Sequence, residues 1–409
     1  DILASLEWLG LTWDEGPYRQ SERLGIYRRY VQELLDRGAA YYCQCRPEEL
    51  EARRQAAKAR GESPRYDGHC RDLNLPPGPE HAIRFRSPRE GVTHWHDLTR
   101  GPIAFNNNEL DDLVLMRADG VPTYNFAVVI DDLTMGVTHV IRGDDHISNT
   151  PRQLLIYEAL GVAPPQFAHI PMILGPDRAK LSKRHGALSV LAYRELGYLP
   201  EAMINFLARL GWSHGDQEIF SRDELIRFFS LEHVGKAAGV FDQEKLNWLN
   251  GHYLRERPAE DLAVLLPEFL RPLGVETVVD ARLVKIVRTL QPRVQTLAEM
   301  AAQARFYFTD PRPYEEKGAR KFLTAQVRPC LEQICRCLHE LGDLTEEAVN
   351  QCFYRVQQEA GLKMRDLAQA VRLALTGRTA SPGLFEIIEI LGVDEVCRRL
   401  QAAQAACQP

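Results

Sequence analysis

Three cysteines near the start of the chain could bind one metal ion together. Cys43 and Cys45 are separated by one residue, and Cys70 follows after 24 intervening residues. Residues two apart in an extended segment point to the same side, so both thiolates could reach one ion. A structural zinc needs four ligands, and three side chains near Cys70 could supply the fourth: Tyr66, His69 and Asp72. Without a shared ion, the three would be unrelated free cysteines.

A basic loop, Lys180-Leu-Ser-Lys-Arg184, could bind phosphate. Two lysines on either side of a serine can hold a polyphosphate and neutralise the charge on a departing pyrophosphate. Alone, such a loop is more often simply solvated. The strand predicted at 170–174 favours a site, because ligands of open α/β sheets gather beyond the carboxyl ends of strands. Neither a P-loop nor a dinucleotide-binding glycine motif occurs in the sequence.

Arg142 and Tyr124 form the third candidate. Arg142 follows a strand predicted at 137–141, and Tyr124 lies on a predicted strand before it. An arginine can bind a carboxylate through two hydrogen bonds, and a tyrosine can orient an amino group or a carboxylate. The alternative is a structural salt bridge from Arg142 to a nearby aspartate, of which the sequence offers four: Asp131, Asp132, Asp144 and Asp145. The residues themselves leave both interpretations open.

The composition limits what kind of protein carries these residues. The chain has 409 residues, 45% hydrophobic and 26% charged, which predicts a globular protein of two or three domains and excludes a disordered or collagen-like chain. No apolar stretch approaches the roughly 20 residues that cross a bilayer, so no membrane association is expected. Nine cysteines, an odd number at low density, favour a reducing compartment. The first residues lack the features of a signal peptide.

Hydrophobic periodicity places these candidates on an α/β framework. Residues 21–37 and a charged stretch from Pro47 to Arg60 predict helices. The pattern is β from Ala82 to about Ile141, with Val114–Arg117 and Thr123–Phe126 flanking an Asp-Gly turn. A helix is predicted from Thr150 to Gly161 before the 170–174 strand. Strand, helix and strand in this order predict a parallel α/β unit.

The second half of the chain is predicted to be helical from about residue 187 onward, with a boundary near Pro258. Basic and acidic residues nearly balance in 258–409, so bulk charge does not argue for a nucleic-acid partner. Cys335 and Cys337 lie in a helical pattern, where residues two apart diverge by roughly 200°, so they should not share an ion. The remaining cysteines are predicted to be packing residues: Cys330, Cys352, Cys397 and Cys407.

Several of these segments together resemble one family. The 180–184 loop resembles the K-M-S-K-S signature of class I aminoacyl-tRNA synthetases, with Leu for Met and Arg for the final Ser. With residues 119–126, 129–132 and 140–146, it is similar to bacterial glutamyl-tRNA synthetase. The likeness covers nearly the whole chain and includes Ser381-Pro-Gly-Leu-Phe-Glu386, which resembles the anticodon-binding domain of the bacterial type.

The resemblance implies an α/β nucleotide-binding, Rossmann-like catalytic domain with an α+β insertion, followed by an all-α anticodon-binding domain. The implied segments are the remainder of the N-terminal half of the catalytic domain (1–40), an inserted zinc-containing acceptor-binding domain (41–118), the second half of the catalytic domain with the basic loop (119–190), a helical connector that contacts the tRNA stem (191–257) and the anticodon-binding domain (258–409).

The resemblance also implies roles for individual residues. Lys180, Ser182 and Lys183 would hold the phosphates of ATP, with Lys183 stabilising the pyrophosphate leaving group. The backbone near Met172 and Ile173 would contact adenine.

Two further sites follow from the same resemblance. Tyr124 and Arg142 would bind glutamate, with Arg142 pairing with its side-chain carboxylate. Cys43, Cys45 and Cys70 match a zinc site found in part of the family, where Tyr66 fits one pattern for the fourth ligand and Asp72 takes the place of a His in another.

The implied reaction uses ATP with Mg²⁺ to convert L-glutamate to glutamyl-adenylate, and then transfers the glutamyl group to the 3′ end of tRNA(Glu). The expected protein is a monomer of the bacterial cytoplasm, with an organelle as the alternative. The P-S-P-T-G-x-x-H-I-G signature of this group is absent from the chain and is expected upstream of Asp1. Without it, part of the adenylation machinery would be missing.

Two alternatives to this function remain. One is a non-catalytic tRNA-binding fragment or paralogue, which the missing signature would explain. The other is a glutamyl-queuosine-tRNA synthetase, which residues 258–409 argue against because that enzyme lacks an anticodon domain.

Overall fold

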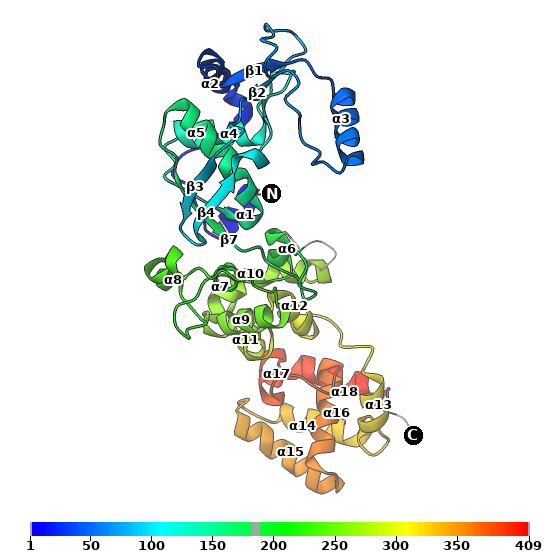
Figure 1. The fold of residues 1–409 in the computed structure, drawn as a ribbon. Helices are drawn as coiled ribbons and strands as arrows, with labels where there is room; N and C mark the ends of the chain where they lie inside the picture. Colours follow the sequence, from blue (N-terminus) through cyan, green and yellow to red (C-terminus); the bar gives the residue numbers. More distant parts are fainter. Residues whose placement is uncertain (1, 182–188, 408–409) are drawn as a thin grey trace. The chain divides into compact units, whose positions relative to one another are not determined.

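A computed structural model describes residues 2–181 and 189–407 (Figure 1). The chain divides into two compact units. The α/β unit comprises residues 11–187 and 207–241, and the helical unit comprises residues 1–10, 188–206 and 242–409. No helix in the described part of the chain is both long and apolar enough to span a membrane.

The larger sheet of the α/β unit has four strands in the order β4-β3-β7-β6. Strands β3 (Val92–Asp97) and β4 (Gly101–Asn106) form an antiparallel hairpin. Strand β7 (Gln166–Ile170) runs parallel to both β3 and β6 (His139–Gly143). Three parallel strands therefore end at one edge of this sheet.

Helices of the α/β unit form a hydrophobic core around α4 (Tyr124–Thr134) and α5 (Thr150–Leu160), which pack together. Helix α2 (Leu24–Asp36) contributes Tyr27 and Leu34, which are completely buried. The helix predicted after residue 150 is confirmed. It ends where predicted because Gly161 adopts the left-handed conformation (φ 70°) that ends many helices.

Two predicted strands are wrong. Residues 123–126 do not form the second arm of a hairpin, because α4 begins at Tyr124. Its buried residues, Phe126, Ala127, Val129 and Ile130, follow helical spacing, which a short apolar run can hide. The strand predicted at 170–174 lies earlier, as β7, which ends at Ile170. Of residues 171–174, only Leu174 forms isolated strand bridges, to Lys180 and Val240.

A smaller antiparallel sheet has the strand order β1-β2-β5. Its strands are β1 (Ala40–Cys43), β2 (Ala82–Phe85) and β5 (Val114–Met116). The charged helix predicted after Pro47 is present as α3 (Pro47–Ala59), between β1 and β2. Helix α8 (Arg222–Phe228) lies in residues 207–241, the second segment of the α/β unit.

Among the described residues, every helix or strand element after residue 189 is a helix, as predicted. The elements of this part, together with the first helix of the chain, are α1 (Ile2–Trp8), α6 (Val190–Glu195), α7 (Pro200–Arg209), α9 (Gln243–Glu256), α10 (Ala259–Leu270), α11 (Ala281–Leu290), α12 (Leu297–Ala304), α13 (Glu316–Phe322), α14 (Arg328–His339), α15 (Glu346–Ala360), α16 (Met364–Thr376), α17 (Leu384–Leu391) and α18 (Val393–Gln404). One large hydrophobic cluster holds most of them together.

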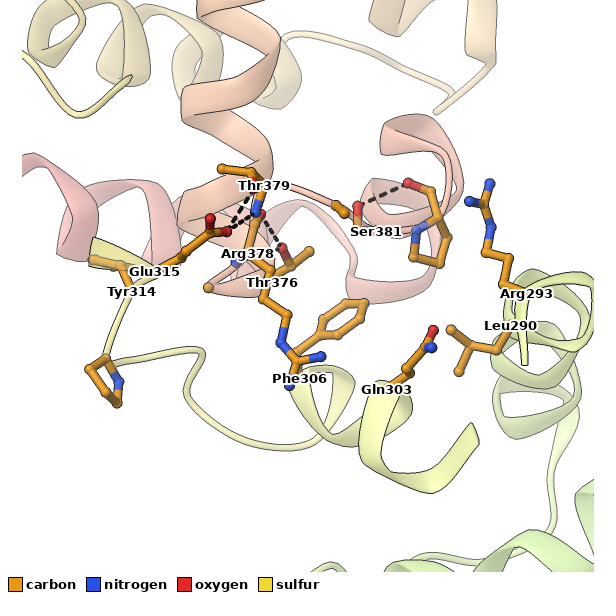
Figure 2. Close-up of a pocket in the computed structure, with 14 residues that line it drawn as sticks. Leu290, Arg293, Gln303, Phe306, Tyr314, Glu315, Thr376, Arg378, Thr379 and Ser381 are labelled. Carbon is orange, nitrogen blue, oxygen red and sulfur yellow. Dashed lines mark hydrogen bonds between the residues drawn. The ribbon is translucent and has the colours of Figure 1, made fainter. Parts of the chain in front are cut away.

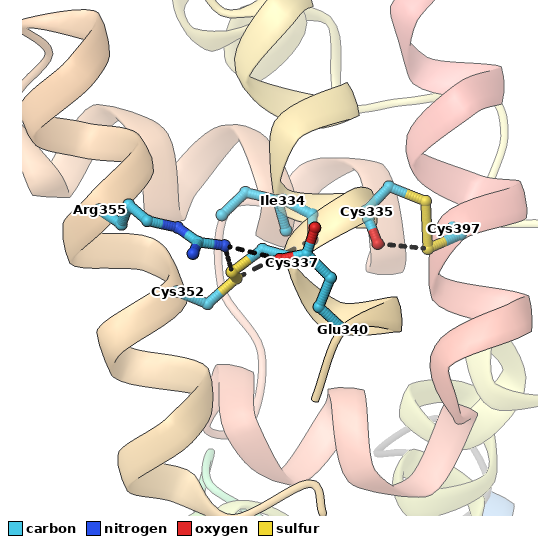
Figure 3. Close-up of a disulfide and its surroundings, with 7 residues drawn as sticks. All are labelled: Ile334, Cys335, Cys337, Glu340, Cys352, Arg355 and Cys397. Carbon is cyan, nitrogen blue, oxygen red and sulfur yellow. Dashed lines mark hydrogen bonds and ion pairs between the residues drawn. A yellow bond between two sulfur atoms is a disulfide. The ribbon is translucent and has the colours of Figure 1, made fainter. Parts of the chain in front are cut away.

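Two disulfides connect helices of this unit (Figure 3). Cys335 is bonded to Cys397 and joins α14 to α18, and Cys337 is bonded to Cys352 and joins α14 to α15. The prediction that Cys352 and Cys397 are only packing residues is therefore wrong. The predicted divergence of positions 335 and 337 explains the pattern, because each sulfur faces a different neighbouring helix. The two other late cysteines, Cys330 and Cys407, are free thiols.

Candidate active site

The carboxyl edge of the larger sheet brings together polar residues from three strands. Asp97 is the last residue of β3, His169 lies one residue before the end of β7, and Arg142 lies one residue before the end of β6. Arg142 and His169 are direct neighbours in the register of β6 and β7. This edge is where open α/β sheets bind their ligands.

Arg142 is held by buried uncharged groups. Its Nε donates a hydrogen bond to His169 Nε2 (3.2 Å), and its Nη2 donates one to Thr150 Oγ1 (2.9 Å). Its guanidinium carbon lies 5.4 Å from the centre of the Phe167 ring. Burial lowers the pKa of Arg142, while a hydrogen bond with the nearby Tyr124 opposes that shift.

The alternative of a structural salt bridge to Arg142 is not realised. Within the ranges that the structure describes, no carboxylate lies within ion-pair distance of Arg142. Asp132 and Asp97 influence it only through longer-range charge. The other three candidate aspartates pair elsewhere: Asp131 with Arg23 (2.7 Å), Asp144 with Arg100 (2.7 Å) and Asp145 with Lys180 (3.0 Å). Buried charges are normally paired, so the arrangement suits an anionic ligand.

Tyr124 lies close to Arg142, as the sequence predicted for a shared site. It is the first residue of α4, and about half of it (51%) is exposed. Its hydroxyl lies 3.4 Å from His146 Nδ1. The sequence reasoning did not select Asp97, Thr150 or His169. The one indication in the sequence was that each of them lies at or near the end of a helix or strand, and a parallel sheet brings such ends together.

The beginning of the basic loop returns to the end of β7. Leu174 and Lys180 form an antiparallel bridge, and the Leu181 N–H donates to the Ile173 carbonyl (3.0 Å). The backbone at Met172 and Ile173 thus lies beside the start of the loop. Lys180 Nζ lies 3.0 Å from Asp145 Oδ2 in an exposed pair. Ser182 and Lys183 lie outside the described residues.

The predicted cysteine cluster forms in the α/β unit. The sulfur atoms of Cys43, Cys45 and Cys70 all lie within 4.8 Å of one another. The Tyr66 hydroxyl lies 3.5 Å from the Cys43 sulfur and 3.9 Å from the Cys45 sulfur. Asp72 instead pairs with Arg86 (3.0 Å), and 78% of its side chain is exposed. Three thiols and one phenol oxygen at these distances fit a tetrahedral zinc ion.

A second group in the helical unit, Cys335, His339 and Cys397, is equally compact. Two of its sulfurs are joined in a disulfide, so it offers no pair of thiolates.

The helical unit contains a cavity of about 610 Å³ (Figure 2). Its lining comes from the ends of α11 and α12 with the residues that follow them, from residues 313–315, and from the end of α16 with the loop after it, and includes Arg293, Phe306, Thr376, Arg378 and Ser381. The Ser381–Glu386 motif that the sequence singled out begins in this loop and continues into α17.

Neighbouring side chains fix this loop. Arg372 donates to the Pro382 carbonyl (2.7 Å), and Glu315 accepts from the Thr379 N–H and hydroxyl (2.9 and 2.7 Å). The cavity therefore combines the arginine and hydroxyls of a fixed loop with Arg293 and the Phe306 ring, which lie outside that loop.

Comparisons with known proteins agree across both units. Residues 1–248 match the family model for the catalytic domain of class I tRNA synthetases (E and Q), and residues 261–404 match an anticodon binding domain. The chain is 57% identical to a glutamate–tRNA ligase of Syntrophobacter fumaroxidans, over 98% of this chain and 86% of that protein. It is 55% identical to one of Geotalea uraniireducens, over 99% and 87%.

A solved structure of a glutamate tRNA ligase from Elizabethkingia meningosepticum, in complex with its amino acid, matches with a TM-score of 0.87. The two sequences are 33% identical, and the match covers 100% of this chain and 89% of the other.

Proposed function

Because the chain belongs to the class I glutamate–tRNA ligases, we propose that Arg142 and Tyr124 bind the glutamate substrate at the carboxyl edge of the sheet. Arg142 pairs with the side-chain carboxylate of glutamate, and the Tyr124 hydroxyl orients the bound amino acid. One observation carries this assignment: a half-buried arginine whose hydrogen-bond partners among the described residues are all uncharged. An anionic ligand completes such a site.

The reaction that this site serves has two steps. The α-carboxylate of glutamate attacks the α-phosphorus of ATP, and the bond to pyrophosphate breaks to give glutamyl-adenylate. A terminal ribose hydroxyl of tRNA(Glu) then attacks the acyl carbon, and AMP leaves. Mg²⁺ supplies charge neutralisation on the phosphates. Most of the protein's contribution is alignment and electrostatic stabilisation.

The phosphates of ATP are proposed to contact Lys180. They are also proposed to contact Ser182 and Lys183, which lie outside the described residues. The proximity of Met172 and Ile173 to the start of that loop supports a role for their backbone in contacting adenine.

The cysteine cluster is proposed to bind one structural zinc ion through Cys43, Cys45, Cys70 and Tyr66. The guanidinium carbon of Arg84 lies 3.8 Å from the centre of the Tyr66 ring, and hydrogen bonds from Tyr66 and Arg84 outweigh the effect of burial and lower the pKa of the Cys43 thiol. Zinc would fasten the segment that contains α3 to strand β1. We expect about one zinc per chain in metal analysis, and its loss in Cys70→Ser. An equal zinc content in Asp72→Asn is the matched control, and a zinc-free protein contradicts the proposal.

The cavity of the helical unit is proposed to receive bases of the tRNA anticodon. Unstacked bases bind to aromatic rings and arginine planes, and phosphates bind to arginines. Phe306, Arg293 and Arg378 provide these groups. Residues 41–118 would contact the acceptor end and 191–257 the stem, with the protein acting as a monomer.

The amino-acid assignment is tested with Arg142→Gln, which removes the charge and keeps hydrogen-bonding capacity. In aminoacylation assays we expect the KM for glutamate to rise by about 100-fold and the KM for ATP to stay within about twofold, because the half-buried charged partner of the substrate carboxylate is lost. Asp145→Asn, at the same edge, is the control and should leave the KM for glutamate unchanged. An unaltered KM for glutamate in Arg142→Gln would refute the assignment.

A further inference from the structure

Behind Arg142 lies a pair of ionisable side chains that the proposed reaction does not use. Asp97 and His169 are both completely buried, and Asp97 Oδ2 lies 2.5 Å from His169 Nδ1. His169 lies on β7, the strand next to the β6 strand of Arg142, and Asp97 lies on β3, the strand beyond β7. Such a pair is costly to bury, so its chemistry calls for an explanation.

Asp97 is held as a carboxylate. Its Oδ1 accepts hydrogen bonds from the backbone N–H groups of Thr99, Arg100 and His169, all at 3.0–3.1 Å, and from the Thr99 hydroxyl. Burial alone would raise its pKa, but the hydrogen bonds from His169 and these neighbours lower the pKa of Asp97 to about 2. An ionised carboxylate only accepts hydrogen bonds. The proton between the two side chains therefore belongs to His169 Nδ1.

His169 is held as a neutral imidazole. Burial is the largest influence on the pKa of His169 and lowers it; the hydrogen bond and the charge of Asp97 oppose that shift, and the positive charge of Arg142 adds to it, so the pKa stays below its ordinary value. With the proton on Nδ1, the other ring nitrogen, Nε2, is an acceptor. Two donors face it: Arg142 Nε at 3.2 Å and the Thr150 hydroxyl at 3.1 Å.

Thr150 completes the arrangement. Its hydroxyl oxygen accepts from Arg142 Nη2 (2.9 Å) and lies 3.1 Å from His169 Nε2, whose one lone pair is shared between this hydroxyl and Arg142 Nε. Two donors of the Arg142 guanidinium are thus fixed by two uncharged acceptors. A carboxylate in direct contact would also fix the guanidinium, but it would neutralise the charge that a substrate carboxylate needs.

We propose that Asp97 and His169 are positioning residues for the amino-acid substrate: Asp97 fixes the Nδ1–H tautomer of His169, whose Nε2 holds Arg142 in the orientation that receives the side-chain carboxylate of glutamate. The inference rests on the proposed role of Arg142. It assigns the pair a function in substrate affinity and not only in joining β3 to β7.

Two substitutions of His169 separate these roles. Asparagine places an amide near the Nδ1 position, so His169→Asn can keep the link to Asp97 and lose the acceptor for Arg142. Glutamine places an amide near the Nε2 position, so His169→Gln can keep the acceptor and lose the link. If the pair is purely structural, His169→Asn should preserve function better than His169→Gln. If the pair positions Arg142, His169→Gln should preserve function better.

The experiment measures the affinity of the intact chain for glutamate and for ATP by calorimetry. We expect His169→Asn to weaken glutamate binding by about tenfold or more, the size of one hydrogen bond to a charged group, and His169→Gln to stay within about threefold of the parent. ATP affinity should be unchanged in both. Equal glutamate affinity in both variants, or weaker binding in the Gln variant, would overturn the inference.

A spectroscopic measurement on the unaltered chain keeps the inference testable if these variants fold poorly. In ¹⁵N-histidine NMR, His169 should carry its proton on Nδ1 and have an unprotonated Nε2 at neutral pH. A protonated Nε2 would overturn the inference.

Arg142→Gln distinguishes this inference from the proposed function. If that variant binds glutamate normally, the assignment of Arg142 fails. If it binds glutamate weakly while His169→Asn binds normally, only the positioning role fails.

Discussion

Arg142 is held by buried, uncharged partners, whereas Lys180, beyond the end of β7, is held by an exposed carboxylate. The Lys180–Asp145 pair has side chains that are 64% and 39% exposed, while Asp97 and His169 behind Arg142 are completely buried. Exposed ion pairs add little stability and exchange partners readily. Buried hydrogen-bonded groups keep one geometry. The buried setting suits Arg142 as a fixed binding group for an amino acid. The exposed setting suits Lys180 as a loop residue that can exchange Asp145 for a phosphate.

The pH dependence of stability is the largest effect expected from this contrast. Asp97 has a folded-state pKa of about 2 against an ordinary value of 3.8, and burial lowers the pKa of His169 below its ordinary 6.5. Both pKa values are lowered by folding, so both groups stabilise the fold above their ordinary pKa values and lose that stabilisation as the pH falls. We expect unfolding free energy to decline below about pH 6.5 and to lose about 2 kcal/mol through Asp97 between about pH 4 and 2.

Urea unfolding at a series of pH values measures this acid loss. Asp97→Asn should flatten the decline between pH 4 and 2, because the amide does not titrate. An equally steep decline in that variant would contradict the account of the buried pair.

The exposed pair should show a much smaller effect. We expect Asp145→Asn to change the midpoint of thermal unfolding by no more than about 1 °C, because a solvated pair contributes little to stability. Differential scanning calorimetry at low and high salt measures it. A clear destabilisation that high salt abolishes would mean that Lys180 is a structural residue.

Residues whose types have distinctive chemistry could be proposed as site residues from the sequence alone. Arg142 and Tyr124 were selected as one site, and the structure brings them together. The cysteine spacing likewise predicted a compact cluster. The support for Tyr66 over Asp72 as a ligand comes only from the folded chain, which places the Tyr66 hydroxyl near two of the sulfurs.

The support behind Arg142 could not be read from spacing. Asp97 and His169 are 72 residues apart, and the parallel pairing of β3 with β7 brings them into contact. The strand prediction failed at 123–126, because a short apolar segment fits both the two-residue period of a strand and the 3.6-residue period of a helix. The strand predicted at 170–174 lies earlier, as β7. The disulfide partners of α14 depend on which helices pack beside it.

The most direct test of the central claim compares the binding of glutamate with that of glutamine, which differs only in replacing the side-chain carboxylate by an uncharged amide. Calorimetry on the intact chain should show glutamate binding at least about 100-fold more tightly, because the charge of Arg142 is not neutralised by its partners. In Arg142→Gln the ratio should fall below about tenfold. A ratio that is the same in both proteins would contradict the account.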